Sequence, residues 1–317
     1  MGTTRKVLRK VAVIIEPTAR TYQAPTTRIP QTSFTINAMF DMIEDESIDG
    51  QAYKALPNQG TKRVEGTLAG IVDVDTIDPI LEAAHGAESS QVYSLPSTVN
   101  EKTLSIICVD GVKTYKYTGA VIKGITFTSE PNGRLVYSAD VIAYTETRDD
   151  TAFPAMTYEK GTRIVHHHAG GTGFLRVGDQ TNALAAGDNL GLSSLEWGWE
   201  WGFDHEFDNT SQTTLIPLST ICTPKFSFQI SRHSLDTYLA FRDAGTALQA
   251  SLYFYASSSA TLLVEIPNFI LPEAAVTEDD IAKIDIATMV GANGIGSSYS
   301  NSNMSFVTPI RTTLVNS

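Results

Sequence analysis

The sequence predicts an α+β fold that is mainly β, with two tandem, sheet-dominated domains that each carry one short helix. Residues 195–203 alternate large apolar side chains with glutamate or glycine, which is the pattern of a half-buried β-strand. A similar alternation occurs 159 residues earlier, at residues 36–42. This offset is about half of the 317-residue chain, and that length exceeds the usual size of a single core. We therefore infer a tandem duplication.

The first copy is expected to contain several strands and one helix. The helix spans residues 75–86, where Pro79 is tolerated in the first turn and Gly86 ends it. Asp75 or Thr76 is expected to cap its start. The expected strands are residues 10–15, 34–43, 63–73, 105–109, 125–128 and 135–142, with an extended connector at 18–33 and a tight Asn-Gly turn at 132–133. One helix among several strands is typical of an α+β half with a sheet-dominated core.

Adding 159 to these positions gives the second copy. The strand at 63–73 maps onto residues 225–231, and the helix maps onto residues 235–245, with Gly86 on Gly245. After the helix the offset falls to 148, so the first copy is expected to carry about eleven extra residues between positions 87 and 103. The expected organisation is a first domain at 1–150 with an N-terminal arm at 1–33, a linker at 151–173, and a second domain at 174–317.

Charge and composition exclude several classes of protein. The chain has 23 basic and 35 acidic residues, a formal net charge of −12, which argues against a protein that clamps nucleic acid. No apolar run approaches ~18 residues and the start lacks a long apolar segment, so we expect neither a membrane helix nor a signal peptide. Cys108 and Cys222 lie in apolar, strand-like runs and are expected to be buried free thiols, made in a reducing compartment.

Four cations are crowded into the first ten positions: Arg5, Lys6, Arg9 and Lys10. They either guard an exposed edge strand or form an arm that docks on an acidic neighbour, and the sequence leaves both interpretations open.

Three neighbouring histidines are the first candidate for a metal site. In an extended segment His166 and His168 share a side and could chelate a metal ion, with His167 between them. No cysteine or carboxylate stands nearby at ligand spacing, and two glycines follow at 170–171. We interpret the segment as a solvated linker, and we expect no catalytic residue, no metal site and no cofactor in this chain.

The run from Asp73 to Asp78 begins like a calcium loop. Asp78 stands where the loop needs glycine, and Ala84 stands where it needs the bidentate glutamate, so an EF-hand is excluded. Asp73, Asp75 and Asp78 are instead expected to stabilise the positive end of the helix.

Two further patterns have weak chemical meaning. Gly291, Gly294 and Gly296 precede serine-rich coil rather than a helix, which argues against a dinucleotide-binding loop. Ser231, His233 and Asp236 lie close in sequence, but the chain has no nucleophile elbow and nothing supplies an oxyanion hole.

The tryptophan face of residues 195–203 has two interpretations. Trp197, Trp199 and Trp201 pack in the core or a subunit interface, or they stack sugars as a carbohydrate-binding protein requires. At the offset of 159 the first copy has Ala38, Phe40 and Met42 in their places. These residues do not form a sugar platform, which favours the core or interface.

The order and spacing of several segments resemble the major tail tube proteins of bacteriophages with long non-contractile tails (siphophages), in the type with two tube domains per chain. The likeness covers roughly residues 30–290. The segments that carry it are residues 66–71, 78–86, 115–122, 124–127, 131–133, 174–179 and 192–203.

The resemblance implies two tandem tail-tube-like β-sandwich domains, each flanked by its short helix. It also implies a non-enzymatic structural subunit of the virion tail, assembled in the host bacterial cytoplasm. It implies trimeric rings with pseudo-sixfold symmetry that stack into a hollow tube, through which genomic DNA passes during ejection without specific binding. It also implies ring-to-ring contacts through the loops at 44–60 and 204–219, and no outward decoration module. The implied partners are further copies of the chain and the tail terminator, tape measure and distal tail proteins, with no membrane. The alternatives are a receptor- or carbohydrate-binding β-protein of a virion surface and, more weakly, a metal-dependent hydrolase.

Overall fold

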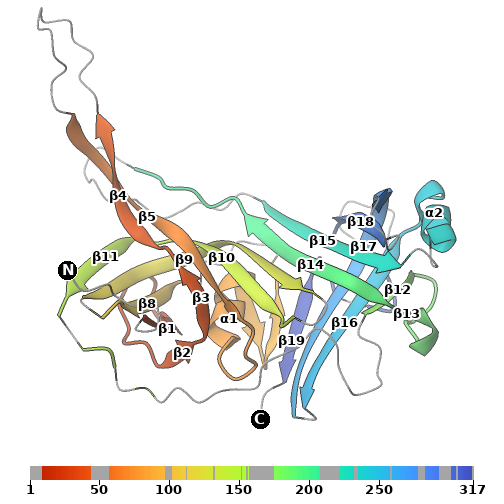
Figure 1. Ribbon diagram of the computed structural model, residues 1–317, viewed down its shortest axis with the longest axis horizontal. Coiled ribbons are helices and arrows are strands. Elements are labelled where there is room, and N and C mark those ends of the chain that lie inside the picture. The colour runs from red at the N-terminus through yellow and green to blue at the C-terminus, as the bar shows by residue number, and fades with distance from the viewer. Residues whose placement is uncertain are drawn as a thin grey trace, which may run out of the picture.

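The computed structural model contains mainly β-structure, with antiparallel sheets and two short helices (Figure 1). It describes residues 9–43, 57–96, 102–111, 113–130, 133–150, 152–154, 156, 175–207, 221–231, 235–257, 259–277, 283–292, 301–304 and 306–315. The first half of the chain forms the lobe at the left of Figure 1 and the second half forms the lobe at the right. Neither described helix is long and apolar enough to cross a membrane.

The first half contains one helix among short and long strands. Its elements are β1 (Lys10–Ile15), β2 (Thr27–Ile29), β3 (Gln31–Phe34), β4 (Asn37–Ile43), β5 (Asn58–Ile71), α1 (Asp78–His85), β6 (Ala87–Ser89), β7 (Val92–Ser94), β8 (Leu104–Val109), β9 (Thr114–Ser129), β10 (Val136–Ile142) and β11 (Thr145–Asp149).

The second half contains the corresponding elements in nearly the same order. They are β12 (Leu175–Asp179), a 3₁₀ turn η2 (Ala186–Asp188), β13 (Asn189–Leu190), β14 (Leu192–Trp201), β15 (Cys222–Ser231), α2 (Leu235–Asp243), β16 (Leu248–Ser257), β17 (Ala260–Thr277), β18 (Lys283–Val290) and β19 (Arg311–Val315).

The two halves share one strand order. In the first half, β4, β5, β10 and β9 pair in that sequence, and β1, β8, β9 and β11 form the other layer. In the second half, β14, β15, β18 and β17 pair in that sequence, and β12, β16, β17 and β19 form the other layer. The long strands β9 and β17 each take part in both layers and each carry a bulge against their neighbour. Such bulges bend a strand and let it pass from one sheet to the next.

The strand register corrects one detail of the sequence comparison. Phe34 faces Leu68 in the first half, and Leu195 faces Phe228 in the second, and all four are buried. Matching these pairs relates β4 to β14 by 161 residues rather than 159, and it also aligns the bulges of β9 and β17. Side chains alternate with a period of two, so the sequence pattern alone fits both offsets equally well. The residues that correspond to Trp197, Trp199 and Trp201 are therefore Ile36, Ala38 and Phe40.

The first helix ends as expected but begins differently. Gly86 has φ of 87° and its N–H donates to the Glu82 carbonyl, and Gly245 at the end of α2 has φ of 60°, so both glycines occupy the left-handed region that ends a helix. The residue before the first turn of α1 is Ile77, which makes no side-chain cap. The expected cap by Asp75 or Thr76 is wrong, because Asp73 holds this turn: its carbonyl accepts from the Ile77 N–H.

Other boundaries also differ from the expectation. The connector at 18–33 contains β2 and most of β3, and the strand expected at 34–43 is interrupted at residues 35–36. The loop expected at 44–60 is shorter, because β5 already begins at Asn58. Cys108 is a buried free thiol as expected, whereas Cys222 is only half-buried because it stands at the first position of β15.

The extra residues of the first copy connect the two halves. They include the β6–β7 hairpin, and β7 pairs with β19 of the second half, with Tyr93 opposite Thr312. The Leu95 N–H also donates to the Thr308 hydroxyl at 3.0 Å. One hydrophobic cluster of buried residues extends through both halves.

Candidate functional site: a continuous sheet with two free edges

The main surface feature is one antiparallel sheet that runs through both halves. Its strands pair in the order β4, β5, β10, β9, β14, β15, β18 and β17. The link between the halves is the pairing of β9 with β14, which places Phe127 opposite Trp197 and Ile125 opposite Trp199. Among the described pairings, β4 and the residues 273–277 of β17 are the outer edges of this sheet.

One face of the continuous sheet is polar and built from small side chains. A row across five strands contains Ala69, Ser138, Thr126, Gly198 and Lys225, which face one another in register. Rows on either side of it add the acidic residues Asp140, Glu196 and Glu200. Lys225 lies 3.5 Å from Glu200, so it offsets one of these negative charges. Within these rows, three acidic side chains therefore stand against one lysine.

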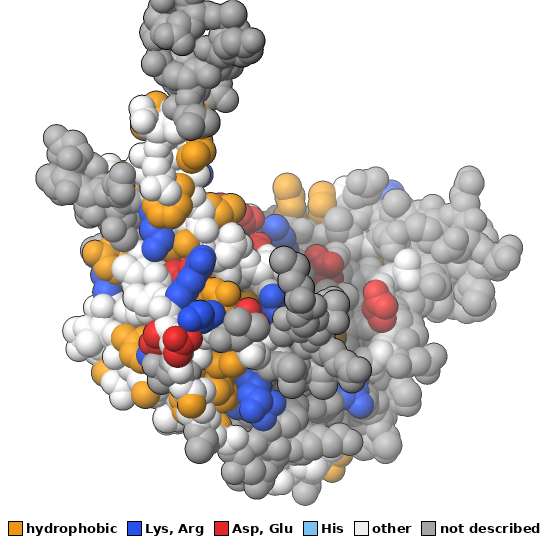
Figure 2. Space-filling model, turned by 60° about the vertical axis from the view of Figure 1, so that its left-hand side comes forward, with side chains coloured by type: hydrophobic (Ala, Val, Ile, Leu, Met, Phe, Trp, Pro, Cys, Tyr) orange, Lys and Arg blue, Asp and Glu red, His pale blue; other side chains and the backbone are white. Residues whose placement is uncertain are grey.

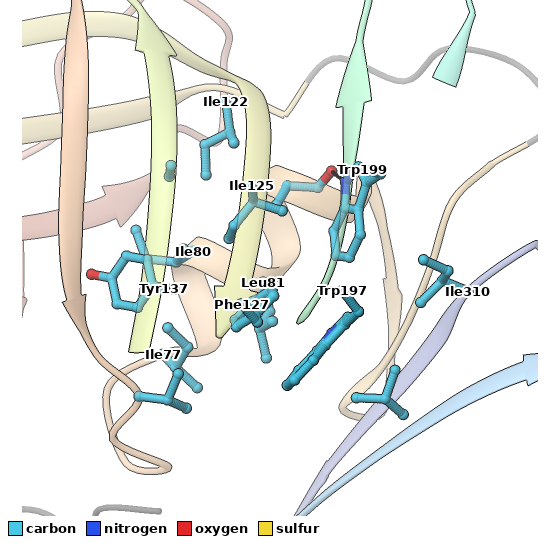
Figure 3. Close-up of a cluster of buried hydrophobic side chains, with 14 of the residues drawn as sticks. Ile77, Ile80, Leu81, Ile122, Ile125, Phe127, Tyr137, Trp197, Trp199 and Ile310 are labelled. Carbon is cyan, nitrogen blue, oxygen red and sulfur yellow. Dashed lines mark hydrogen bonds between the residues drawn. The ribbon is translucent and has the colours of Figure 1, made fainter. Parts of the chain in front are cut away.

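The opposite face is apolar and buries the junction between the halves (Figure 3). Trp197 stacks on Phe127 with ring centroids 5.0 Å apart, and it also stacks on Phe254 of the second half with centroids 5.2 Å apart. Trp199 and Trp201 both donate from Nε1 to the Ala84 carbonyl, at 2.8 and 2.9 Å. That carbonyl lies in the last turn of α1, where helix carbonyls lack partners within the helix. The tryptophans thus fix β14 of the second half onto β9 and α1 of the first.

Burial of the tryptophans answers the question that their pattern raised. Trp197, Trp199 and Trp201 are 1, 2 and 6% exposed. A platform for sugars must expose the ring faces, and these faces are covered by protein. The carbohydrate-binding interpretation of this strand is therefore wrong, and of the two other interpretations, core or subunit interface, the structure confirms the core.

His85 is a second contact between the halves. Its Nδ1–H donates to the Leu81 carbonyl at 2.9 Å, because a carbonyl can only accept, and its Nε2 then accepts from the Thr312 hydroxyl of β19 at 3.1 Å. The ring also packs on Trp199 with centroids 4.2 Å apart. Complete burial lowers the pKa of His85 to about 3, so the imidazole is neutral at ordinary pH.

The β4–β5 hairpin forms an arm that rises from the first lobe (Figures 1 and 2). Hydrophobic side chains lie along it, and four of them are exposed: Met39, Phe40, Met42 and Ile43, at 44, 41, 58 and 60%. Asp41 accepts from Arg63 and Thr61 across the two strands, and these bonds, with the guanidinium first, lower the pKa of its carboxyl group. An arm with this many large exposed apolar side chains is typical of a surface that contacts another protein.

The first residues after β14 lie beside this hairpin. His205 Nε2 lies 3.7 Å from Glu65 Oε2 of β5, and the His205 ring stacks near Phe207 with centroids 5.9 Å apart. Burial lowers the pKa of His205, and the nearby Glu65 opposes that shift. The loop residues 44–56 and 208–220, which make up most of the two expected contact loops, lie outside the described residues.

The other sequence candidates do not form a chemical site in the described part of the chain. Asp73 accepts from the Asp75 N–H at 3.2 Å, and Asp78 accepts from the Tyr93 hydroxyl, so these carboxylates hold local structure. Ser231 ends β15 and Asp236 lies in α2, whereas His233 falls outside the described residues.

The remaining candidates are only partly covered. His166, His167 and His168 lie outside the described residues, as do Gly294 and Gly296, whereas Gly291 follows β18. Within the described ranges no three His, Cys, Asp or Glu side chains are grouped so that they could hold a metal ion.

Comparison with known proteins gives one family. A model of the phage tail tube protein family matches residues 8–287, nearly the whole chain. A search of the curated proteins gave no match. The match covers both halves, the junction between them and the free edge of β4, and it agrees with the mainly β fold. The chain therefore belongs to the phage tail tube protein family, whose members are non-enzymatic structural proteins of the virion tail.

Proposed function

We propose that three copies of this chain close into a ring with pseudo-sixfold symmetry, and that such rings stack into the tail tube of a siphophage. Genomic DNA would pass through the lumen during ejection without being bound. In this proposal residues 1–150 are the first tube domain, with an arm at 1–33, residues 151–173 are the linker, and residues 174–317 are the second tube domain.

The observation that carries the proposal is the continuous sheet with two free edges. Its eight strands come from two halves with one strand order, which supports a ring in which each chain would supply two equivalent sectors. Unpaired edges favour further pairing, and closing the sheet into a barrel removes them. Three chains with eight strands each give a barrel wider than those of about 16–18 strands that already leave an aqueous channel.

The polar face of the sheet suits a DNA conduit. The aromatic face packs against the rest of the protein, so closure would direct the face with Ser138, Thr126 and Gly198 toward the lumen. Asp140, Glu196 and Glu200 on this face repel the DNA backbone, and small neutral side chains offer it little to bind. The duplex can then move along the tube without being held at any one ring.

We assign the stacking contacts to the loop that follows β4 and to the loop that follows β14. The hairpin projects from its lobe and leads into residues 44–56. The loops at 44–60 and 204–219 would contact the next ring along the tube. The tail terminator, the tape measure protein and the distal tail protein would then meet the ends and the lumen of the stack.

Electron microscopy of the purified chain tests this function. We expect hollow filaments of uniform width, and single-molecule mass measurements of dissociated material should find units of three chains. A single species without a central channel under all tested conditions would contradict the proposal.

A second experiment tests DNA passage apart from assembly. Glu196 is exposed on the polar face, so in phage particles Glu196→Lys should leave the tubes intact and slow DNA ejection, and Glu196→Gln is the matched control. Equal ejection rates for the lysine variant and the natural chain would contradict a lumen on this face.

A further inference from the structure

The junction inside the chain shows how two equivalent units fit together. β9 and β14 pair antiparallel over residues 124–129 and 195–200, with Trp197 opposite Phe127. β14 also contacts α1, since the Ala84 carbonyl accepts from both Trp199 and Trp201. Five side chains of α1 are buried, namely Ile80, Leu81, Ala83, Ala84 and His85, and the ring of His85 packs on Trp199. The internal junction therefore combines a strand pairing with a helix contact.

The same two surfaces occur a second time, at the outside of the chain. β4 corresponds to β14, and residues 273–277 of β17 correspond to residues 124–128 of β9. Among the described ladders β4 pairs only with β5, and residues 273–277 pair only with β18. Each chain thus has one unused copy of each partner in the junction.

Side-chain exposure agrees with this arrangement. Trp201 at the internal junction is 6% exposed, whereas Phe40, at the corresponding position of β4, is 41% exposed. Met42, which corresponds to the buried Phe203, is 58% exposed. α2 is also less covered than α1, since Tyr238 is the one buried side chain among its described side chains. The apolar side chains at the end of β4 are therefore exposed in the single chain, whereas their counterparts after and in β14 are buried.

We propose that β4 of one copy pairs antiparallel with residues 273–277 of a second copy, in the register that β14 has on β9. The proposal rests on the proposed function and names the contact that would hold the ring together. The register places Asn37 opposite Ala275, Ala38 opposite Ala274 and Ile36 opposite Val276. Phe40 and Met42 then lie toward α2 of the second copy, as Trp201 and Phe203 lie toward α1.

The edge of β4 is partly occupied in the single chain. The Ala38 N–H donates to Glu146 Oε2 at 2.9 Å, and the Tyr117 hydroxyl donates to the Ile36 carbonyl at 2.7 Å. Glu146 is also held by Arg148 at 2.6 Å. Pairing with a second copy replaces these side-chain bonds with backbone bonds of a strand ladder. The edge is therefore protected against indiscriminate pairing, which is a common property of edge strands.

Disulfide formation between two introduced cysteines tests the register of β4 on residues 273–277 of the second copy. Because the Ala38 N–H points away from β5, Asn37 should face its new partner at a non-hydrogen-bonded position, where opposing Cα atoms lie about 4.5 Å apart. That distance suits a disulfide. We expect Asn37→Cys with Ala275→Cys to crosslink assembled tubes into species of up to three chains, and reductant should reverse it.

The matched control moves one cysteine by two positions. Asn37→Cys with Glu273→Cys keeps both side chains on one face but separates them diagonally by about 7–8 Å, so it should crosslink much less. The unmodified chain controls for its own thiols, since burial raises the pKa of Cys108 and of Cys222 to about 12 and keeps them protonated and slow to react. Tubes that form without a crosslink at 37 and 275, or that crosslink better at 37 and 273, would overturn the register.

Hydrogen exchange on the unmodified chain keeps the test independent of the variants. Backbone amides at residues 36–40 and 273–277 should exchange more slowly in tubes than in unassembled protein. Unchanged exchange in either segment of assembled tubes overturns the proposed contact while leaving the tube function intact. Failure of the unmodified chain to form tubes at all contradicts the proposed function itself, and with it the ring that this contact closes.

Discussion

Trp199 of the second half donates from Nε1 to the Ala84 carbonyl of the first half at 2.8 Å, and both residues are buried. This bond joins a strand of one repeat to the helix of the other across 115 residues of sequence. Trp201 makes the same contact at 2.9 Å, so one helix-terminal carbonyl receives two indole donors. This relationship explains why the tryptophans of the chain lie on one strand: they attach β14 of the second half to β9 and α1 of the first.

Replacing either indole should weaken the contact between β14 and α1 and lower the free energy of unfolding. Trp199→Phe removes one donor but leaves Trp201 on the Ala84 carbonyl, so we expect a loss of about 1–2 kcal/mol in the free energy of unfolding. The double variant Trp199→Phe, Trp201→Phe leaves the buried carbonyl without either indole and should cost more than the sum of the single variants. Urea unfolding of the four proteins in a double-mutant cycle measures this, and strictly additive losses would contradict the shared acceptor.

Gly198 should tolerate no side chain because the two halves meet there at backbone distance. A Cβ at this position would overlap the Ile125 carbonyl oxygen of β9, whereas a Cβ at Gly191 meets nothing within 4 Å. Gly198→Ala is therefore expected to lose several kcal/mol of stability, or to separate β9 from β14, and Gly191→Ala should change stability by less than about 1 kcal/mol. Thermal unfolding compares the two, and equal melting temperatures would contradict the close approach.

His85 should make stability depend on pH. Its pKa is lowered to about 3 in the fold, while the unfolded chain has a value near 6.5, so the unfolded state binds more protons between these values. The stability from neutral His85 is complete above about pH 6.5 and falls as the pH drops toward 3, by at most about 1.4 kcal/mol per unit. We expect the natural chain to lose about 1.6 kcal/mol more than His85→Gln between pH 6.5 and 5. Parallel pH curves in chemical unfolding would contradict this.

Shortening the loop between β4 and β5 should separate folding from stacking. Replacing residues 46–55 by a two-residue turn leaves the described strands and core unchanged, so the melting temperature should stay close to that of the natural chain. If the loop contacts the next ring, the variant should form single rings without long tubes. Electron microscopy checks the outcome, and long tubes from the shortened chain would show that this loop is not the stacking contact.

Local patterns predicted the repeated elements well. The alternation at residues 195–203 gave β14, and the sequence of Pro79 and Gly86 gave the first turn and the end of α1, because these signals depend on neighbouring residues only. The offset of 148 after the helix gave the extra segment that contains β6 and β7. The cap of α1 was missed because Asp73 forms a turn that competes with a cap at Asp75 or Thr76.

Long-range pairing could not be predicted in the same way. The contact of β9 with β14 joins residues about 70 positions apart, and neither strand carries a local signal for its partner. The offset of 159 against 161 shows the same limit, since a shift by two residues leaves every side chain on its face. The pairing of β7 with β19 could not be predicted either, because short strands have too few residues to show an alternation of apolar and polar side chains.

The most direct test of the account is a helical reconstruction of the assembled tube by electron cryomicroscopy. We predict rings of three chains in which six similar lobes surround an open lumen, with β4 of each chain beside residues 273–277 of the next. Rings of six chains, or filaments with a filled centre, would contradict it.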